Sequence, residues 1–191
     1  GKNLMFSFVL YPTFLEARKQ FLLSQIASLA VKETLDLYIG DVSIKWPNDI
    51  YWKDKKICGM LIENDLMGIH ISQSITGVGI NINQKEFHSS APNPISIIQI
   101  THRESDRMEI LAQVLQRIKE YYKILQEGDI EFITDRYQAA LFRKESIHFY
   151  KDSEGTFNAG IVEVEADGHL VLQDETGKIR RYLFKEVQYI L

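Results

Sequence analysis

The chain has 191 residues and a formal net charge of −4. An acidic balance argues against DNA or RNA as the main partner, because proteins that bind phosphate backbones usually present a basic face. The single cysteine, Cys58, excludes a disulfide within the chain and favours a reducing, cytoplasmic setting. No apolar run approaches the roughly 18–20 residues of a membrane-spanning helix, so no membrane partner is expected.

Strands dominate the first half of the predicted secondary structure. Apolar and β-prone runs predict strands at 3–11, 42–46, 50–52 and 56–63, followed by two more strands or one bent pair at 68–82. Between the first two strands, residues 14–38 carry apolar side chains at helical spacing. They predict one long amphipathic helix that Gly40 ends.

The middle of the chain reads as a loop followed by helices. Residues 85–94 are polar and hold two of the four prolines, which is typical of a loop. A short helix is expected next, within 94–101. Residues 105–125 predict a strong helix capped by Ser105, and residues 129–141 predict another that starts at its own aspartate.

The pattern changes after Arg143. Residues 144–191 alternate apolar and polar side chains, with the turn signals SEG, ADG and ETG at short intervals. This pattern is typical of a small all-β barrel or meander. We therefore predict two domains, at 1–143 and 144–191.

The stretch KWPNDIYWKDKKICG, residues 45–59, concentrates charged and backbone-restricting residues. Pro47 fixes its own φ and keeps Trp46 out of the helical region, so Asn48 and Asp49 are expected at a strand end, where binding groups are common. The hairpin that follows returns Lys56 toward the same end. Gly59 would let a bound molecule approach the backbone closely.

Each of these features also has a purely structural interpretation. Residues 53–55 fit a solvated turn, and the two tryptophans fit core or rim positions. Cys58 fits a small buried apolar residue. The run GVGIN at 77–81 fits a bulge or close packing of strands. It lacks the third glycine of the nucleotide-binding fingerprint.

The combination, however, resembles the catalytic core of the biotin protein ligases. KWPND comes first, then a lysine seven residues after the aspartate, then a small residue and glycine, then GMLIE and GVGININ. The resemblance extends over nearly the whole chain. It implies an α+β fold, in which a mixed central sheet backed by helices (the biotin/lipoate ligase fold) precedes a small SH3-like β-barrel.

This resemblance implies a reaction and its partners. The family activates biotin with ATP to biotinyl-5′-adenylate and pyrophosphate, with Mg²⁺ assisting. It then transfers biotin to one lysine of a biotin carboxyl carrier protein domain on a biotin-dependent carboxylase. Some relatives form homodimers through the central sheet, here near residues 60–82.

The resemblance also assigns residues. Lys56 takes the position of the catalytic lysine that bridges the biotin carboxylate and the α-phosphate. The expected biotin-binding residues are Lys56, Gly59, Leu61, Gly77 and Gly79. The expected ATP-binding residues are Lys45, Asn48, Asp49 and Asn81, and Asp49 is also a candidate ligand for Mg²⁺.

One departure from the family pattern leaves three hypotheses. The Gly/Arg-rich loop that folds over biotin in the family, expected just before Asn3, has no counterpart in residues 1–191, and neither has a DNA-binding domain. The sequence thus indicates a biotin protein ligase truncated at its N-terminus. The alternatives are a lipoate-type ligase and a catalytically inactive module of the same fold that binds carrier domains.

Overall fold

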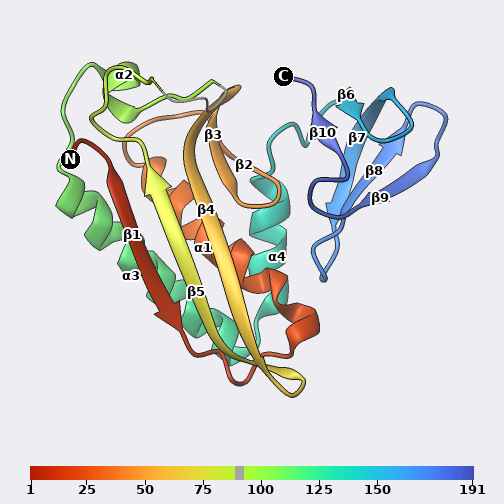
Figure 1. The fold of residues 1–191 in the computed structure, drawn as a ribbon, viewed down its shortest axis with the longest axis horizontal. Helices are drawn as coiled ribbons and strands as arrows, with labels where there is room; N and C mark the ends of the chain where they lie inside the picture. The colour runs from red at the N-terminus through yellow and green to blue at the C-terminus, as the bar shows by residue number, and fades with distance from the viewer. Residues whose placement is uncertain (89–92) are drawn as a thin grey trace.

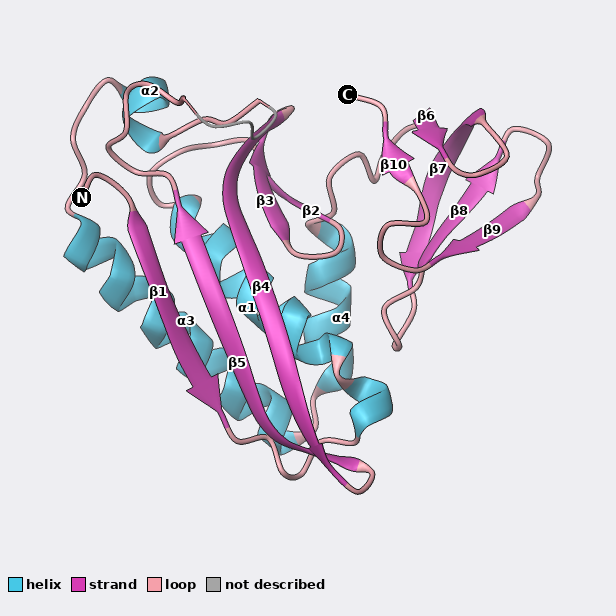
Figure 2. Ribbon diagram, viewed as in Figure 1, coloured by secondary structure: helices cyan, strands magenta, loops and turns pink. Residues whose placement is uncertain are grey.

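The computed structural model describes residues 1–88 and 93–191, which form two sheets and a layer of helices (Figures 1 and 2). The first sheet contains β1 (Leu4–Leu10), β2 (Val42–Lys45), β3 (Asp49–Trp52), β4 (Lys55–Met67) and β5 (His70–Ile80). The helices are η1 (Ala17–Lys19), α1 (Phe21–Leu35), α2 (Ile97–Thr101), α3 (Arg107–Glu127) and α4 (Ile130–Ala139). The second sheet contains β6 (His148–Lys151), β7 (Thr156–Val164), β8 (Leu170–Asp174), β9 (Ile179–Tyr182) and β10 (Gln188–Tyr189).

The first sheet has the strand order β1-β5-β4-β3-β2, and all four strand pairs are antiparallel. The expectation of a mixed sheet is therefore wrong, although the α+β class and the backing by helices are confirmed. Strands β2 to β5 follow one another as a meander joined by short connections, a path that produces antiparallel neighbours. The segment 68–82 contributes one strand, β5, rather than two.

Among the residues that the structure describes, helices cover one face of this sheet and not the other (Figure 2). On β1 and β5 the side chains alternate, so Leu4, Val78 and Ile80 are buried against the helix layer. Their neighbours Met5 and Leu61 point to the opposite side and are 88% and 65% exposed. The sheet therefore has a core face and an open face, and the open face is free to hold a ligand.

The helices are confirmed with shifted ends. The predicted helix 14–38 is shortened to η1 and α1, because the main chains of Leu15 and Ala17 bond to Ile71 and Ile69 near the β4–β5 turn. The α3 helix is capped by Asp106 rather than by the neighbouring serine. In the described part of the chain, no helix combines the length and apolar character needed to cross a membrane. Positions 89–92 of the predicted loop lie outside the described residues.

The second sheet, ordered β10-β6-β7-β8-β9, is antiparallel. The prediction of a small all-β unit is confirmed: β6 to β9 form a meander, and β10 returns to pair with β6. The β7–β8 turn contacts the first sheet, since the Trp46 indole Nε1 donates to the main-chain oxygen of Gly168 at 2.9 Å. Gly168 has a φ of +97°, and a Cβ there would come within 2.8 Å of the Phe21 ring. Only glycine meets both demands, so this turn is fitted to the α1 surface.

Replacing Gly168 with alanine is therefore expected to destabilise the protein more than the same change at Gly177. Gly177 also has a positive φ, +86°, but a Cβ there has no described atom within 4 Å. Gly177→Ala should cost about 1–2 kcal/mol for the backbone conformation alone. Gly168→Ala should add about 1–3 kcal/mol of overpacking. Urea unfolding measures both free energies, and equal losses would contradict the fit of the turn against Phe21.

Candidate functional site

A pocket of about 670 Å³ lies on the open face of the first sheet. We call it the open-face pocket. Four strands line it, namely β1 through Met5, Phe6 and Ser7, β3 through Asp49, β4 through Lys56, Gly59, Met60 and Leu61, and β5 through Gly77, Val78 and Gly79. The predicted catalytic lysine and all the predicted biotin-binding residues are thus brought together in one place.

A β-bulge in the β3–β4 hairpin creates this site. The register passes from Ile50 opposite Cys58 to Tyr51 opposite Lys56, so Ile57 has no partner on β3. A bulge of this kind inserts one extra residue and redirects the side chains that follow. Here it lies directly beside the lysine.

The bulge decides which face Lys56 occupies. On β4, Gly59 and Leu61 face the open side. Strict alternation would continue with Ile57 outward and Lys56 inward. Because of the extra residue, Ile57 is fully buried and Lys56 lines the pocket instead.

Lys56 forms an ion pair across the hairpin. Its Nζ lies 2.7 Å from Oδ1 of Asp49, and both side chains keep partial contact with solvent, at 33% and 23% exposure. A Cβ at Gly59 would lie 3.0 Å from Cε and 3.1 Å from Nζ of this lysine. Because Gly59 has no side chain, the Cε and Nζ atoms of Lys56 have room to lie above its main chain.

Two cross-strand rows form the floor and walls. The first row joins Met5, Gly79, Gly59 and Asp49 in register across four strands. The second joins Ser7, Gly77 and Leu61. Three glycines at the centre leave the main chain bare, with apolar walls from Met5 and Leu61. Such a site can hold a ligand whose flat apolar part lies on the bare backbone and whose anionic group reaches Lys56.

Two predicted ATP-binding residues have structural contacts of their own. The Asn48 side-chain amide donates to the main-chain oxygen of Met60 at 2.8 Å, across the hairpin. Asn81 follows the end of β5. Its N–H donates to the oxygen of the bulge residue Ile57 at 2.9 Å, and its carbonyl accepts from Ile97 at 3.2 Å. These contacts hold the end of the site where the bulge lies.

Lys45 lies opposite Asp49 in the β2–β3 pair, but it does not line the open-face pocket. Its Nζ is 4.5 Å from the ring centroid of Tyr189 and 5.3 Å from that of Tyr51. This lysine lines a separate cavity of about 460 Å³ between β2 and the C-terminal segment, which we call the C-terminal slot. Burial lowers the pKa of the Lys45 ammonium, with Asp49 acting in the opposite direction. The other three ATP-binding candidates do not line this slot.

Sequence reasoning missed part of the site. Met5 and Ser7 line the open-face pocket, and the alternation of the first strand could have placed them on one face. Tyr189, which contacts Lys45, is separated from it by 144 positions in the sequence, so no local pattern links them. Cys58 is buried as expected, and burial raises the pKa of its thiol far above the ordinary value.

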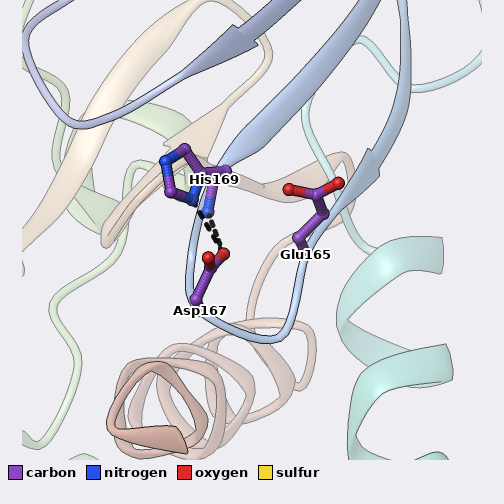
Figure 3. Close-up of side chains that lie close together, drawn as sticks. All are labelled: Glu165, Asp167 and His169. Atoms are coloured by element: carbon purple, nitrogen blue, oxygen red, sulfur yellow. Dashed lines mark hydrogen bonds and ion pairs between the residues drawn. The ribbon is translucent and has the colours of Figure 1, made fainter. Parts of the chain in front are cut away.

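A second group of polar side chains lies on the β7–β8 turn (Figure 3). Glu165, Asp167 and His169 have ligand atoms within 4.8 Å of one another. His169 Nδ1 lies 2.8 Å from Asp167 Oδ1, and Glu165 pairs with Arg181 at 2.8 Å. Because one carboxylate is already paired with a cation, these contacts fit an ion-paired turn better than a metal centre.

Comparison with known proteins agrees with this geometry. Residues 1–81 match the sequence model of the Biotin/lipoate A/B protein ligase family. A solved biotin protein ligase from Aquifex aeolicus, in complex with biotin and ATP, superposes with a TM-score of 0.80 at 28% identity. The match covers 99% of this chain and 79% of that one. The chain is thus similar in sequence and in fold to biotin protein ligases.

Two curated proteins match with comparable sequence identity over a smaller share of this chain. The bifunctional ligase/repressor BirA of Bacillus spizizenii is 25% identical over 189 residues, which is 93% of this chain and 55% of the relative. The biotin–[acetyl-CoA-carboxylase] ligase of Paracoccus denitrificans is 30% identical over 96 residues, 47% of this chain and 40% of the relative. The chain thus spans about half the length of the curated relatives it matches.

The half-buried position of Lys45 predicts that stability depends on pH. Between its lowered pKa in the folded chain and the ordinary value near 10.4, the unfolded chain binds more protons. The free energy of unfolding of the wild type should therefore rise with pH in this window, relative to a Lys45→Met variant. Urea unfolding of both proteins from pH 7 to 10.5 measures the trend. A stability difference that does not change with pH would contradict it.

Proposed function

We propose that this chain activates biotin with ATP to biotinyl-5′-adenylate and transfers the biotin to a lysine of a carrier domain. The observation that carries the proposal is the position of Lys56, whose ammonium lies at one end of a glycine floor and pairs with one partly solvated carboxylate. The similarity to biotin protein ligases supports the same activity.

The lining of the open-face pocket supports biotin as its ligand. The fused rings and the aliphatic tail would lie on the bare backbone between Met5 and Leu61. Three glycines allow contact that side chains would prevent. The carboxylate at the end of the tail would then reach Lys56, where a cation is available.

The first chemical step joins two anions. An oxygen of the biotin carboxylate attacks the α-phosphorus of ATP, a new P–O bond forms, and the bond to the β-phosphate oxygen breaks to release pyrophosphate. Lys56 would stay protonated, exchange Asp49 for the carboxylate, and stabilise negative charge as it develops on the α-phosphate. Removing this one cation should slow the step severely.

Asp49 is the carboxylate that lines the pocket, so it is the residue that could hold a divalent cation there. Mg²⁺ commonly binds through one or two carboxylates together with substrate phosphates, and a single aspartate fits that arrangement. When bound with ATP, the ion would neutralise phosphate charge. Lys45, Asn48 and Asn81 remain the candidates for the rest of the nucleotide.

The second step transfers biotin. The amine of a carrier lysine attacks the mixed anhydride, an amide bond forms, and AMP leaves. The acceptor proposed here is the biotin carboxyl carrier domain of a biotin-dependent carboxylase, in keeping with the acetyl-CoA-carboxylase ligase among the relatives. The open side of the sheet gives such a domain a path to the adenylate.

The proposal also covers the domain organisation, the location and the oligomeric state of the protein. Residues 1–143 would form the ligase domain, and residues 144–191 would form an SH3-like domain with β6 to β10 as its strands. A cytoplasmic location, a homodimer through the first sheet and the absence of a DNA partner complete the proposal. Each follows from the sequence and the family rather than from the pocket.

A lipoate-type ligase is the second candidate, because the matching family model covers biotin and lipoate ligases together. Both substrates end in a carboxylate on an aliphatic tail, so Lys56 would serve either one. Competition between biotin and lipoate for the chain separates the two. Displacement of bound biotin by a small excess of lipoate would favour this candidate.

The decisive variant is Lys56→Ala, with Lys55→Ala as its matched control. Lys55 is the preceding lysine, is exposed, and does not line the pocket. With biotin, ATP and Mg²⁺, Lys56→Ala should form biotinyl-5′-adenylate at least about 100-fold more slowly, because a charge-stabilising group in the transition state is lost. Lys55→Ala should stay within about threefold of the wild type. Mass spectrometry of the adenylate measures all three rates.

Two outcomes would contradict the proposal. Equal rates for the two lysine variants would remove Lys56 from the chemistry. A folded wild-type chain that forms no adenylate would refute the proposed activity and favour the inactive carrier-binding module instead.

A further inference from the structure

The main chain of Lys56 has an unusual neighbour. On β4, pairing with β5 ends at Cys58 opposite Ile80, so β5 does not extend beside Lys56. The Lys56 N–H donates instead to the main-chain oxygen of Asn93 at 3.0 Å, and the Lys56 oxygen accepts from the N–H of Ile95 at 2.9 Å. A short segment, residues 93–95, thus takes the place of β5 beside the bulge.

The side chain of Asn93 connects this segment to the β3–β4 turn. Its Nδ2 donates to the main-chain oxygen of Asp54, two residues before Lys56. Asn93 also has a φ of +41°, a conformation that asparagine adopts more readily than most residues. One residue therefore bonds both to the turn and to the lysine main chain.

The β3–β4 turn has a second contact, with Arg143. The Asp54 carboxylate lies 3.5 Å from Nη2 of Arg143, whose Nη1 donates to the oxygen of Ile190 at 2.7 Å. The Asp54 side chain is exposed, so this ion pair is worth little by itself. Asn93 binds the main-chain oxygen of Asp54 instead, and its own Oδ1 is buried.

We propose that Asn93 is a positioning residue for Lys56, an inference that rests on the proposed function. A β-hairpin that changes register by one residue turns each side chain to the other face. Removal of the bulge would turn Lys56 away from Asp49 and from the open-face pocket. By fixing the turn before Lys56 and the main chain of Lys56 itself, Asn93 selects the register in which the ammonium meets the bound carboxylate.

The test compares Asn93→Gly with Asn158→Gly. Glycine accepts the φ of position 93, so this variant removes the amide and little else. Asn158 lies on β7, and its amide donates to Glu175 at 3.2 Å in the other sheet. Calorimetry would measure the dissociation constants of biotin and of biotinol, which has an alcohol in place of the carboxylate.

Asn93→Gly should weaken biotin binding about fivefold, the effect of one hydrogen bond, and change biotinol binding less than twofold. Asn158→Gly should change neither, and thermal melting confirms that each variant is folded. Equal losses for biotin and biotinol would indicate general damage to the pocket and would overturn the positioning role. Unchanged binding of both ligands would overturn it too.

Amide hydrogen exchange tests the same role without a ligand. In Asn93→Gly, and in Asn93→Asp as a second variant that keeps the size of the side chain, the amides of Lys56 and Ile95 should exchange about tenfold faster. Unchanged exchange at both amides overturns the inference. A wild-type chain that binds no biotin refutes the proposed function instead, and these exchange rates then decide the role of Asn93 separately.

Discussion

The position of the Lys56 ammonium, at one end of the glycine floor of the open-face pocket, is the constraint on which the rest of the site depends. Lys56 can reach that place only because one face of the first sheet is left open and because Gly59 leaves room for its tip. An antiparallel meander supplies such a face when its helices cover the other side (Figure 2). The β-bulge at Ile57 then turns the lysine outward.

The strength of the Lys56–Asp49 pair suits the proposed exchange of partners. Both side chains are partly exposed, so the pair is worth at most about 1 kcal/mol. An incoming carboxylate can therefore take the place of Asp49 at small cost. The ion pairs of Arg180 in the second sheet are different, because its partners Asp152 and Asp174 are only 6% and 8% exposed. Pairs of that kind hold structure, whereas the pair in the pocket is available for binding.

The second sheet supports the site from a distance. Its β7–β8 turn accepts the Trp46 indole N–H, and Tyr189 on β10 covers the Lys45 ammonium. Both contacts fall on the residues that lead from β2 into β3. The positions of Asn48 and Asp49, which follow directly, thus depend on a part of the chain that lies more than 100 residues later in sequence.

Much of this arrangement could be predicted from the sequence, for identifiable reasons. Apolar, β-prone runs predicted the strands of the first sheet, and alternation predicted those of the second. The grouping of Lys56, Gly59 and Leu61 came from the resemblance to the biotin protein ligases. The start of the helix predicted at 14–38 could not be predicted correctly, because Leu15 and Ala17 form main-chain bonds to residues near the β4–β5 turn instead of helical ones. The outward direction of Lys56 was also hidden, since a bulge depends on pairing between strands.

Two residues show the limit of local reasoning. Lys45 was grouped with Asp49 by motif, and the two residues lie opposite each other on β2 and β3, yet Lys45 lines the C-terminal slot and Asp49 lines the open-face pocket. Asn93 carried no recognisable signal, because its role arises from a main-chain contact with a residue 37 positions earlier. Such contacts become visible only when the fold is known.

The most direct measurement of the central claim is methyl NMR of the chain titrated with biotin. Met5 and Leu61 line the open-face pocket, whereas Met67, at the end of β4, is 66% exposed and does not line it. Binding of biotin in this pocket predicts intermolecular NOEs from biotin to the methyl groups of Met5 and Leu61, and none to the methyl group of Met67. NOEs confined to Val187 and Leu191 in the C-terminal slot, or no saturable shift at Met5 and Leu61, would contradict it.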